Sequence, residues 1–541
     1  MRRRRRKLRI AVTAIFLLLL IGLIYASRPG RSTFTVSPET TYVTGPLDKD
    51  GYVDYVTALN ERLRGNIKPE ENANVLIWQA TGPQALEATV LGERRLTMPE
   101  EYWQWLGVPP PPEDGDYFVR YEDDVKSGAI NDELDEKKRD QIQRMYRATH
   151  WPWRAEDEPE IAKWLKRNEK PLALVIAASQ CPNNYSPLVP PSYKDGSREA
   201  MGISLLTSAQ ACRYIVAALA CRAMLRVKHG ETAQAWQDLL ACHRLARLVA
   251  RGGHVIELMV AISLESAVGL RADSVFLEYS NLTGNEILKC LHDLEQLPPM
   301  PPVAEKLNLN ERFQSLDHLM YFAREWSERE ELTLSVLHEK RSGFLKLFPR
   351  SVNWDPALYN ANRWYDRVVA CARLKDRAAR KKEMDAIQTE LKALEPKMNL
   401  SQAAREVLVG PKQRGETIGN MLLNWSLLSF GKYAYAQALE GQDRHEQMIR
   451  NLHLAFALAA YHADHSRYPE ILAQLAPKYI DQIPVDLFSG KPLNYKLQGD
   501  GYLFYSVGDN GIDDGGRWHD DDPPGDDLAV RMPVPEPRLK K

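Results

Sequence analysis

The first thirty residues constrain this chain more than any other part of it. Arg2 to Arg6, Lys7 and Arg9 form a dense cationic block, and residues 10–26 then carry no charge and are mostly Leu, Ile, Val, Phe and Ala. A helix that spans a membrane needs roughly 20 apolar residues, with about 17 as the lower limit. Because a charge at the centre of such a helix is costly, the pattern predicts a transmembrane anchor over residues 10–26.

The flanking charges predict how this anchor is oriented. Only Arg28 and Arg31 follow it closely, so the positive-inside rule keeps residues 1–9 in the cytoplasm and exports the rest. We therefore expect a single-pass protein of the bacterial inner (cytoplasmic) membrane whose bulk is periplasmic or otherwise extracytoplasmic. The membrane would be a partner through this N-terminal helix, and residues 27–46 would form a linker.

Two alternatives to an anchor remain open. The segment could be a cleaved signal peptide, because Ala26 can precede a cleavage site. It could also be a helix buried in a soluble core. We favour the anchor, since the run is long for a signal peptide, Ile24 is a poor residue three positions before the cut, and nothing amphipathic interrupts the run.

Length and composition limit the remaining classes. A chain of 541 residues is too long for one core, and about two to four domains or helical subdomains are expected. The net charge of −1 argues against a nucleic-acid partner. None of the six cysteines forms a CxxC pair, which argues against structural zinc and thioredoxin-like chemistry. Export permits disulfides, but four cysteines lie in apolar helical segments where free buried thiols are common, so we assign no bridge.

The spacing of apolar residues predicts a mainly α-helical protein. Around His229-Gly230-Glu231 two long helices form an αα-hairpin that weakly resembles a tetratricopeptide unit, although one copy does not establish a repeat array. Charged residues dominate the stretch 356–395, which is either a coiled-coil-like hairpin arm or a solvated face, with the latter favoured. The body is thus divided into an N-terminal helical region with loops (47–197), a helical-hairpin core (198–297) and long charged helices (303–439).

The residue pattern of the sequence changes after Pro469. Apolar and aromatic residues predict two short strands around 493–497 and 502–507, and a Gly-Asp-Gly turn within 498–501 fits a β-hairpin. Together with the helix before it, this indicates a small α+β module over residues 440–530, followed by a tail at 531–541.

The module carries an ordered series of Tyr, Pro, Leu, Asp, Gly and related residues at Tyr468, Pro469, Leu472, Leu475, Pro484, Asp486, Phe488, Gly490, Pro492, Tyr495, Gly501, Tyr502, Ser506, Gly508, Gly511, Gly515 and Gly516. In the order and spacing of these residues it resembles the globular domain of the major, G-type pseudopilin of type II secretion systems. The whole chain also resembles large bacterial membrane-anchored proteins that end in this module.

Several departures limit what the resemblance implies. A pseudopilin carries a processing site directly before its apolar helix, and this chain has Arg residues there instead. Its pilin-like helix also lies more than 400 residues beyond the anchor, so we do not expect assembly as a pseudopilus subunit. Leu487 replaces the family's Pro, and Asn510 replaces its Asp.

The resemblance implies a calcium site in the C-terminal loop, because the family holds one ion there through Asp side chains and carbonyls. Calcium takes six to eight oxygen ligands and tolerates loop geometry. Many carboxylates in a Gly-rich loop would also repel one another without a cation. The alternative is a solvated acidic loop. The candidate ligands are Asp509, Asp513, Asp514, Asp526 and Asp527, of which the last two match the family's closing Asp pair.

The chain contains no nucleophile elbow, phosphate loop or dinucleotide fingerprint. His462 and His465 could form a metal pair but are interpreted as surface or capping residues, and His229 and His243 as hydrogen-bonded packing residues. We therefore expect a non-enzymatic structural or interaction protein of the cell envelope, with envelope proteins as partners and a link to secretion. The competing hypothesis is an envelope hydrolase whose site is assembled from distant residues.

Overall fold

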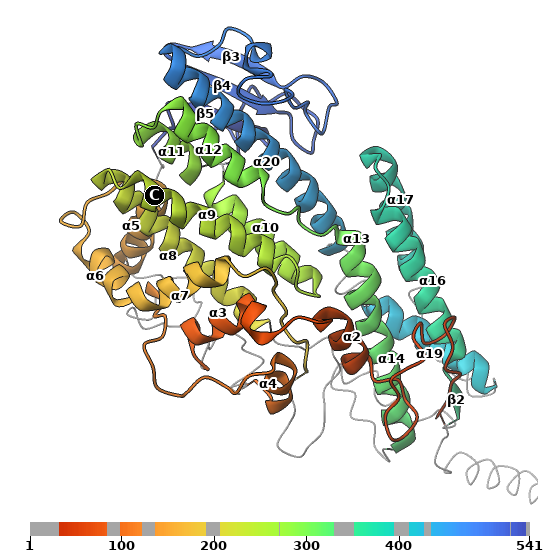
Figure 1. The fold of residues 1–541 in the computed structure, drawn as a ribbon. Helices are drawn as coiled ribbons and strands as arrows, with labels where there is room; N and C mark the ends of the chain where they lie inside the picture. Colours follow the sequence, from red (N-terminus) through yellow and green to blue (C-terminus); the bar gives the residue numbers. More distant parts are fainter. Residues whose placement is uncertain are drawn as a thin grey trace, which may run out of the picture. The chain divides into compact units, whose positions relative to one another are not determined.

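The computed structural model divides the chain into two compact units. The first comprises Met1–Leu59, Arg198–Ile203 and Leu307–Ala436, and the second Asn60–Ser197, Ser204–Lys306 and Gln437–Lys541. Each is treated by itself below. The residues described are 32–83, 98–121, 136–190, 206–269, 271–328, 351–393, 410–426, 434–519 and 521–536. Figure 1 shows a mainly helical fold with a small three-stranded sheet near the C-terminal end, which confirms the expected class.

The first unit is built on a long helical segment and a helical hairpin. Its elements are β1 (Ser32–Thr33), the π-helical turn η4 (Leu307–Glu311), α14 (Arg312–Glu328), β2 (Val352–Asn353), α16 (Asp355–Ala372), α17 (Arg377–Ala393) and α19 (Pro411–Ser426). The helix α2 (Tyr55–Arg64) begins in this unit.

The described part of the predicted linker is packed rather than extended. β1 pairs in parallel with β2, and the Ser32 hydroxyl donates to the Ala323 carbonyl at 2.6 Å. Thr41 is buried, and its hydroxyl donates to the Val43 carbonyl at 2.8 Å. Residues 32–46 are therefore part of the folded unit, which corrects the linker boundary. The Pro, Ser and Thr composition that indicated a tether instead forms local turns whose hydroxyls bind backbone groups.

The second unit holds most of the helices. They are η1 (Pro69–Glu71), α3 (Ala73–Thr81), α4 (Glu100–Leu106), α5 (Glu136–His150), α6 (Pro159–Arg167), α7 (Glu169–Ser179), α8 (Thr207–His229), α9 (Thr232–Val249), α10 (Val255–Val268), α11 (Ala272–Tyr279), α12 (Gly284–Glu295), α13 (Val303–Lys306), the long α20 (Ala434–His465) and the short η6 (Leu472–Leu475).

The predicted αα-hairpin is present as α8 and α9. Gly230 adopts a left-handed conformation (φ 76°) and ends α8, which only glycine does at little cost. α10 follows as the predicted third helix, and it starts with a capping box in which the His254 ring accepts from the Ile256 N–H.

The C-terminal sheet is antiparallel with the order β3 (Asn494–Gln498), β4 (Gly501–Ser506) and β5 (Leu528–Met532). The hairpin of β3 and β4 matches the predicted one, while β5 begins in the predicted module and enters the predicted tail. α20 lies beside the sheet in Figure 1, and the Asn451 amide donates to the Leu528 carbonyl at 2.8 Å. Beyond β5 the chain stays attached, since the Val534 N–H donates to Glu278 at 2.7 Å.

Two sequence expectations concern membrane crossing and cysteines. Within the described ranges no helix has the length and apolar character required to cross a membrane. The predicted cytoplasmic segment and anchor, residues 1–26, lie outside the described residues. All six cysteines are free: Cys181 is partly buried, and the other five are buried at Cys212, Cys221, Cys242, Cys290 and Cys371.

We predict that Gly501→Ala weakens the C-terminal sheet, because a Cβ at this position would lie 1.8 Å from the Met532 carbonyl oxygen. Overpacking of this kind costs about 1–3 kcal/mol, and more where a strand must move. Gly499→Ala is the control, because no atom lies within 4 Å of its Cβ and only its left-handed φ is strained. Urea unfolding and amide exchange in β5 measure the difference, and equal effects of the two variants would contradict the close approach.

Candidate functional site

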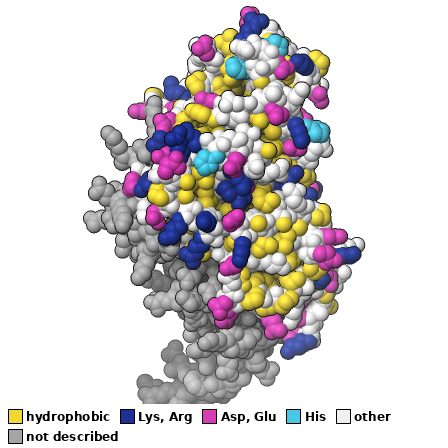
Figure 2. All heavy atoms as spheres, turned by 60° about the vertical axis from the view of Figure 1, so that its left-hand side comes forward, with side chains coloured by type: hydrophobic (Ala, Val, Ile, Leu, Met, Phe, Trp, Pro, Cys, Tyr) yellow, Lys and Arg dark blue, Asp and Glu magenta, His cyan; other side chains and the backbone are white. Residues whose placement is uncertain are grey.

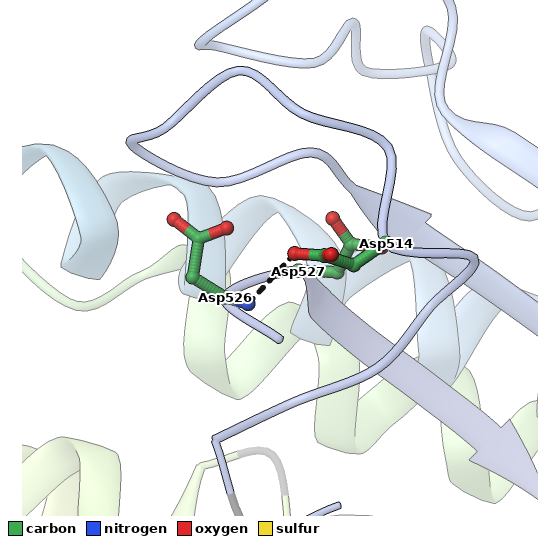
Figure 3. Close-up of side chains that lie close together, drawn as sticks. All are labelled: Asp514, Asp526 and Asp527. Atoms are coloured by element: carbon green, nitrogen blue, oxygen red, sulfur yellow. Dashed lines mark hydrogen bonds between the residues drawn. The ribbon is translucent and has the colours of Figure 1, made fainter. Parts of the chain in front are cut away.

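The acidic loop between β4 and β5 brings together three of the five predicted calcium ligands. Asp514, Asp526 and Asp527 each place one carboxylate oxygen within 4.8 Å of the others. Figure 3 shows the carboxyl groups of Asp514 and Asp527 next to each other and that of Asp526 to one side. Asp526 and Asp527 directly precede β5, so the start of a strand fixes the backbone of this pair.

Asp527 is the most buried of the three ligands. Its side chain is fully buried, and Oδ2 accepts from the Gly516 N–H at 2.7 Å. Oδ1 is also buried and has no hydrogen-bond partner within the described part of the chain. Burial raises the pKa of this carboxyl group, and the charges of Asp514 and Asp513 raise it further. A carboxyl group held in this way either stays ionised beside a cation or takes up a proton.

The other two carboxylates are held by backbone groups of the same loop. Asp514 Oδ2 accepts from the Asp526 N–H at 3.2 Å, and its Oδ1 pairs with Arg517 at 3.2 Å. Asp526 Oδ2 accepts from the Asn510 N–H at 3.1 Å, while its Oδ1 is buried and unpartnered among the described residues. The loop therefore contains two buried carboxylate oxygens, one of Asp526 and one of Asp527, that have no hydrogen-bond partner among the described residues.

Calcium fits this donor set. Oxygen donors are what the ion prefers, and carboxylates supply the negative charge that raises affinity. Two glycines allow the loop to close around the cluster: a Cβ at Gly508 would lie 2.3 Å from the Asp526 carbonyl oxygen, and one at Gly525 would lie 2.9 Å from the Asp514 Cβ. Asp514, Asp526 and Asp527 would hold the ion, and it would neutralise their mutual repulsion.

The remaining two predicted ligands are engaged elsewhere. Asp509 pairs with Arg444 of α20 at 2.9 Å. Asp513 Oδ1 accepts from the Tyr505 hydroxyl at 2.9 Å and from the Gly515 N–H at 2.9 Å. The sequence around Asp509 and Asp513 does not distinguish them from the three aspartates of the cluster. The turn geometry of a Gly-rich loop decides where each side chain points.

A second cluster of chemical interest is a buried ion-pair network in the helical core. His243 of α9 bonds Glu265 of α10 through Nδ1 and Asp273 of α11 through Nε2, both at 2.9 Å. Glu265 Oε1 also accepts from Arg247 at 3.0 Å, and its Oε2 bonds His445 of α20 at 2.5 Å. We call these five residues the core network.

The surroundings of His243 favour a charged ring. Both ring nitrogens face carboxylate oxygens, so with Glu265 and Asp273 ionised both nitrogens donate, as they do in the imidazolium form. Burial lowers the pKa of His243, but the neighbouring charges of Asp273 and Glu265 outweigh it and raise the pKa to about 9. In return, hydrogen bonds from His243 and His445 hold the pKa of Glu265 well below its usual range despite its burial.

The core network is closed to solvent. His243, Glu265 and Asp273 have no exposed surface. Nearby His453 of α20 stays neutral, since burial and the charge of Arg247 lower its pKa to about 4. A buried, paired cluster of this kind specifies which helices pack together rather than binding a ligand.

Sequence analysis identified this network only in part. The interpretation of His243 as a hydrogen-bonded packing residue is confirmed, whereas His229 is exposed in the last turn of α8 and that half was wrong. The sequence signal for the network was a polar residue within the apolar face of each helix. That signal does not show which apolar faces pack against one another.

His462 and His465 are not brought together as a metal pair among the described residues. His462 stacks on Tyr468 with ring centroids 4.4 Å apart, and His465 stacks on Tyr461 at 4.1 Å. His465 Nδ1 also bonds the Tyr461 carbonyl at 2.9 Å. Both rings are used for packing at the end of α20.

Comparison with known proteins adds no relative. No protein-family model, no curated protein and no solved structure shows a match to this chain. The function must therefore be argued from the residues and geometry above.

We predict that stability falls as the pH rises through about 9, because the folded-state pKa of His243 lies above its ordinary value of 6.5. The charged His243 ring contributes its full stabilisation to the folded state below pH 6.5. About 3 kcal/mol of the free energy of unfolding is lost between pH 6.5 and about 9, at roughly 1.4 kcal/mol per pH unit. His243→Gln should lower the free energy of unfolding by about 3–5 kcal/mol near neutral pH and flatten this dependence.

The control for that experiment is His229→Gln, since His229 is exposed and outside the network. Urea unfolding of both variants between neutral and alkaline pH provides the measurement. An unchanged pH profile in His243→Gln would show that His243 is not charged in the folded protein.

Proposed function

We propose that this chain is a single-pass, membrane-anchored protein of the bacterial cell envelope that serves as a structural or interaction component, linked to secretion. Its bulk lies outside the cytoplasm. Its C-terminal module is a pseudopilin-like domain stabilised by calcium. The observation that carries the placement is the charge-free run 10–26 directly after the cationic block of residues 2–9.

The module supports the pseudopilin-like part of the proposal through its architecture. The long helix α20 is followed by the strands β3 and β4 and then by an Asp- and Gly-rich loop, in the order that the resemblance implies, and β5 follows the loop. The buried and unpartnered oxygens of Asp526 and Asp527 support calcium. A calcium-dependent fold suits an extracytoplasmic protein, because calcium sites of modest affinity are filled only outside the cell.

A role in assembly or interaction is favoured over hydrolysis by the burial of the core network. Its His and carboxylates have the residue types of an acid–base site, but a substrate cannot reach side chains with no exposed surface. On the face drawn in Figure 2, acidic and basic side chains are interspersed among apolar ones. Such a mixed surface suits contacts with proteins rather than with a uniformly charged polymer.

We predict that a reporter enzyme active only outside the cytoplasm is active when fused after Lys541. Deletion of residues 1–26 should abolish this activity, because the anchor also directs export. The intact chain should stay in the membrane pellet after alkaline carbonate washing. An inactive fusion, or release by the wash, would contradict the proposed placement.

We predict that millimolar Ca²⁺ raises the thermal midpoint of the full chain in detergent, since a ligand that binds only the folded state stabilises it, by about 2.7 kcal/mol at a hundred times its Kd. Asp527→Asn should remove most of the shift. Asp509→Asn is the matched control, because Asp509 pairs with Arg444 outside the cluster. Calorimetric titration measures binding directly, and a shift of equal size in Asp527→Asn would rule out this site.

A further inference from the structure

The acidic loop between β4 and β5 is held at its C-terminal end by a side-chain amide of α20. The Asn451 Nδ2 donates to the Leu528 carbonyl at 2.8 Å. Leu528 directly follows Asp527, the most buried of the three candidate calcium ligands. The Asp527 N–H donates in turn to the Arg517 carbonyl at 3.1 Å. The backbone is therefore fixed both at Asp527 and immediately after it.

A second amide of α20 fixes the orientation of the first. Gln447 lies one turn before Asn451, and its Nε2 donates to Asn451 Oδ1 at 2.7 Å. The Gln447 Oε1 accepts from the Leu487 N–H at 2.6 Å. Because the oxygen of each amide accepts and its nitrogen donates, neither side chain can turn over without breaking both of its hydrogen bonds. We call Gln447 and Asn451, which are both fully buried, the amide pair.

The amide pair also reaches the N-terminal end of the acidic loop, through Asp486. This buried residue directly precedes Leu487. Its Oδ1 accepts from the Ser506 hydroxyl at 2.6 Å, and its Oδ2 accepts from the Val507 N–H at 3.4 Å, where β4 ends and the loop begins. Both ends of the acidic loop are therefore tied to the same two side chains of α20.

The two ends of the loop meet where the candidate ligands lie. Ser506 at the end of β4 is paired with Leu528 at the start of β5. A Cβ at Gly508 would lie 2.3 Å from the Asp526 carbonyl oxygen, so the chain passes very close to the acidic pair. Asp526 and Asp527 carry the two buried carboxylate oxygens that have no hydrogen-bond partner among the described residues. Whatever fixes this junction also fixes where those oxygens lie.

Packing alone does not require amides at these two positions. Other inward-facing side chains of α20 are apolar, and Leu452, Leu454 and Phe456 are fully buried. Replacing both partners of a buried hydrogen bond by apolar groups of the same shape can leave stability nearly unchanged. What the amides add is direction, because a buried chain of hydrogen bonds that ends on backbone groups specifies one arrangement of the helix and the loop.

We propose that Gln447 and Asn451 are positioning residues for the calcium site of the acidic loop. The amide pair holds the two ends of the loop together, so that the carboxylates of Asp514, Asp526 and Asp527 converge. It acts through the backbone and not as a ligand, since the oxygen and nitrogen of both amides are already used. Groups that orient metal ligands in this way typically change the affinity for the metal by about 10–100-fold. This inference rests on the calcium site proposed above.

Calorimetric titration of the full chain with Ca²⁺ in detergent tests the proposal. Asn451→Leu keeps the shape of the side chain but removes the donor to the Leu528 carbonyl, and it should raise the Kd by about 10–100-fold. Gln447→Met also conserves volume and leaves the Asn451 amide free to turn over, so it should raise the Kd severalfold. If circular dichroism shows that Asn451→Leu does not fold, the Gln447→Met variant decides the question.

Leu452→Ala is the matched control. Leu452 is the next residue of the same helix and is fully buried, so its truncation destabilises the packing of α20 through a cavity and leaves both amides in place. The folded Leu452→Ala chain should keep the wild-type Kd. A wild-type Kd in Asn451→Leu and Gln447→Met would overturn the proposal. So would an equal rise of the Kd in Leu452→Ala, because the amide pair would then contribute only to packing.

Hydrogen–deuterium exchange of the calcium-free chain separates the positioning role from calcium binding itself. The amides of residues 526–528 should exchange severalfold faster in Asn451→Leu and Gln447→Met than in Leu452→Ala. If the wild-type chain binds no calcium in the titration, the proposed calcium site is wrong. Exchange at 526–528 then still decides whether the amide pair positions the loop, and equal rates in all three variants would show that it does not.

Discussion

The second unit depends on a charge balance that is buried where four helices meet. Glu265 accepts from His243, Arg247 and His445, and Asp273 accepts from the other side of His243. Because His243, Glu265 and Asp273 are fully buried, removing one of them leaves an opposite charge uncompensated in the interior, which costs far more than the pair contributes in net terms. The network therefore selects one packing arrangement of α9, α10, α11 and α20 over the many that apolar faces alone would allow.

This selection matters for the C-terminal module. α20 supplies His445 to the network, and six residues later in the same helix the Asn451 amide donates to the Leu528 carbonyl of β5. The helix is thus shared between the helical core and the module. The helix of the module is tied to the helical body of the second unit through the contact between His445 and Glu265.

The acidic loop is unfavourable without a compensating charge. Buried carboxylate oxygens of Asp526 and Asp527 have no hydrogen-bond partner among the described residues. The calcium ion that we propose would compensate their negative charge and supply that partner.

The sequence by itself determined what depends on local pattern. Apolar spacing gave α8, α9 and α10, Gly230 gave their turn, and the Gly-Asp-Gly segment gave the β3–β4 hairpin, because these are set by neighbours within a few residues. It also identified the acidic loop that holds Asp514, Asp526 and Asp527. Only the tertiary structure decided that Asp509 turns to Arg444 and Asp513 to Tyr505, that residues 32–46 pack instead of forming a tether, and that β5 completes the sheet. It alone joined His243 to Glu265, Asp273 and His445, residues up to 202 positions apart, because a buried charge reveals its partner only when the helices that carry both are packed together.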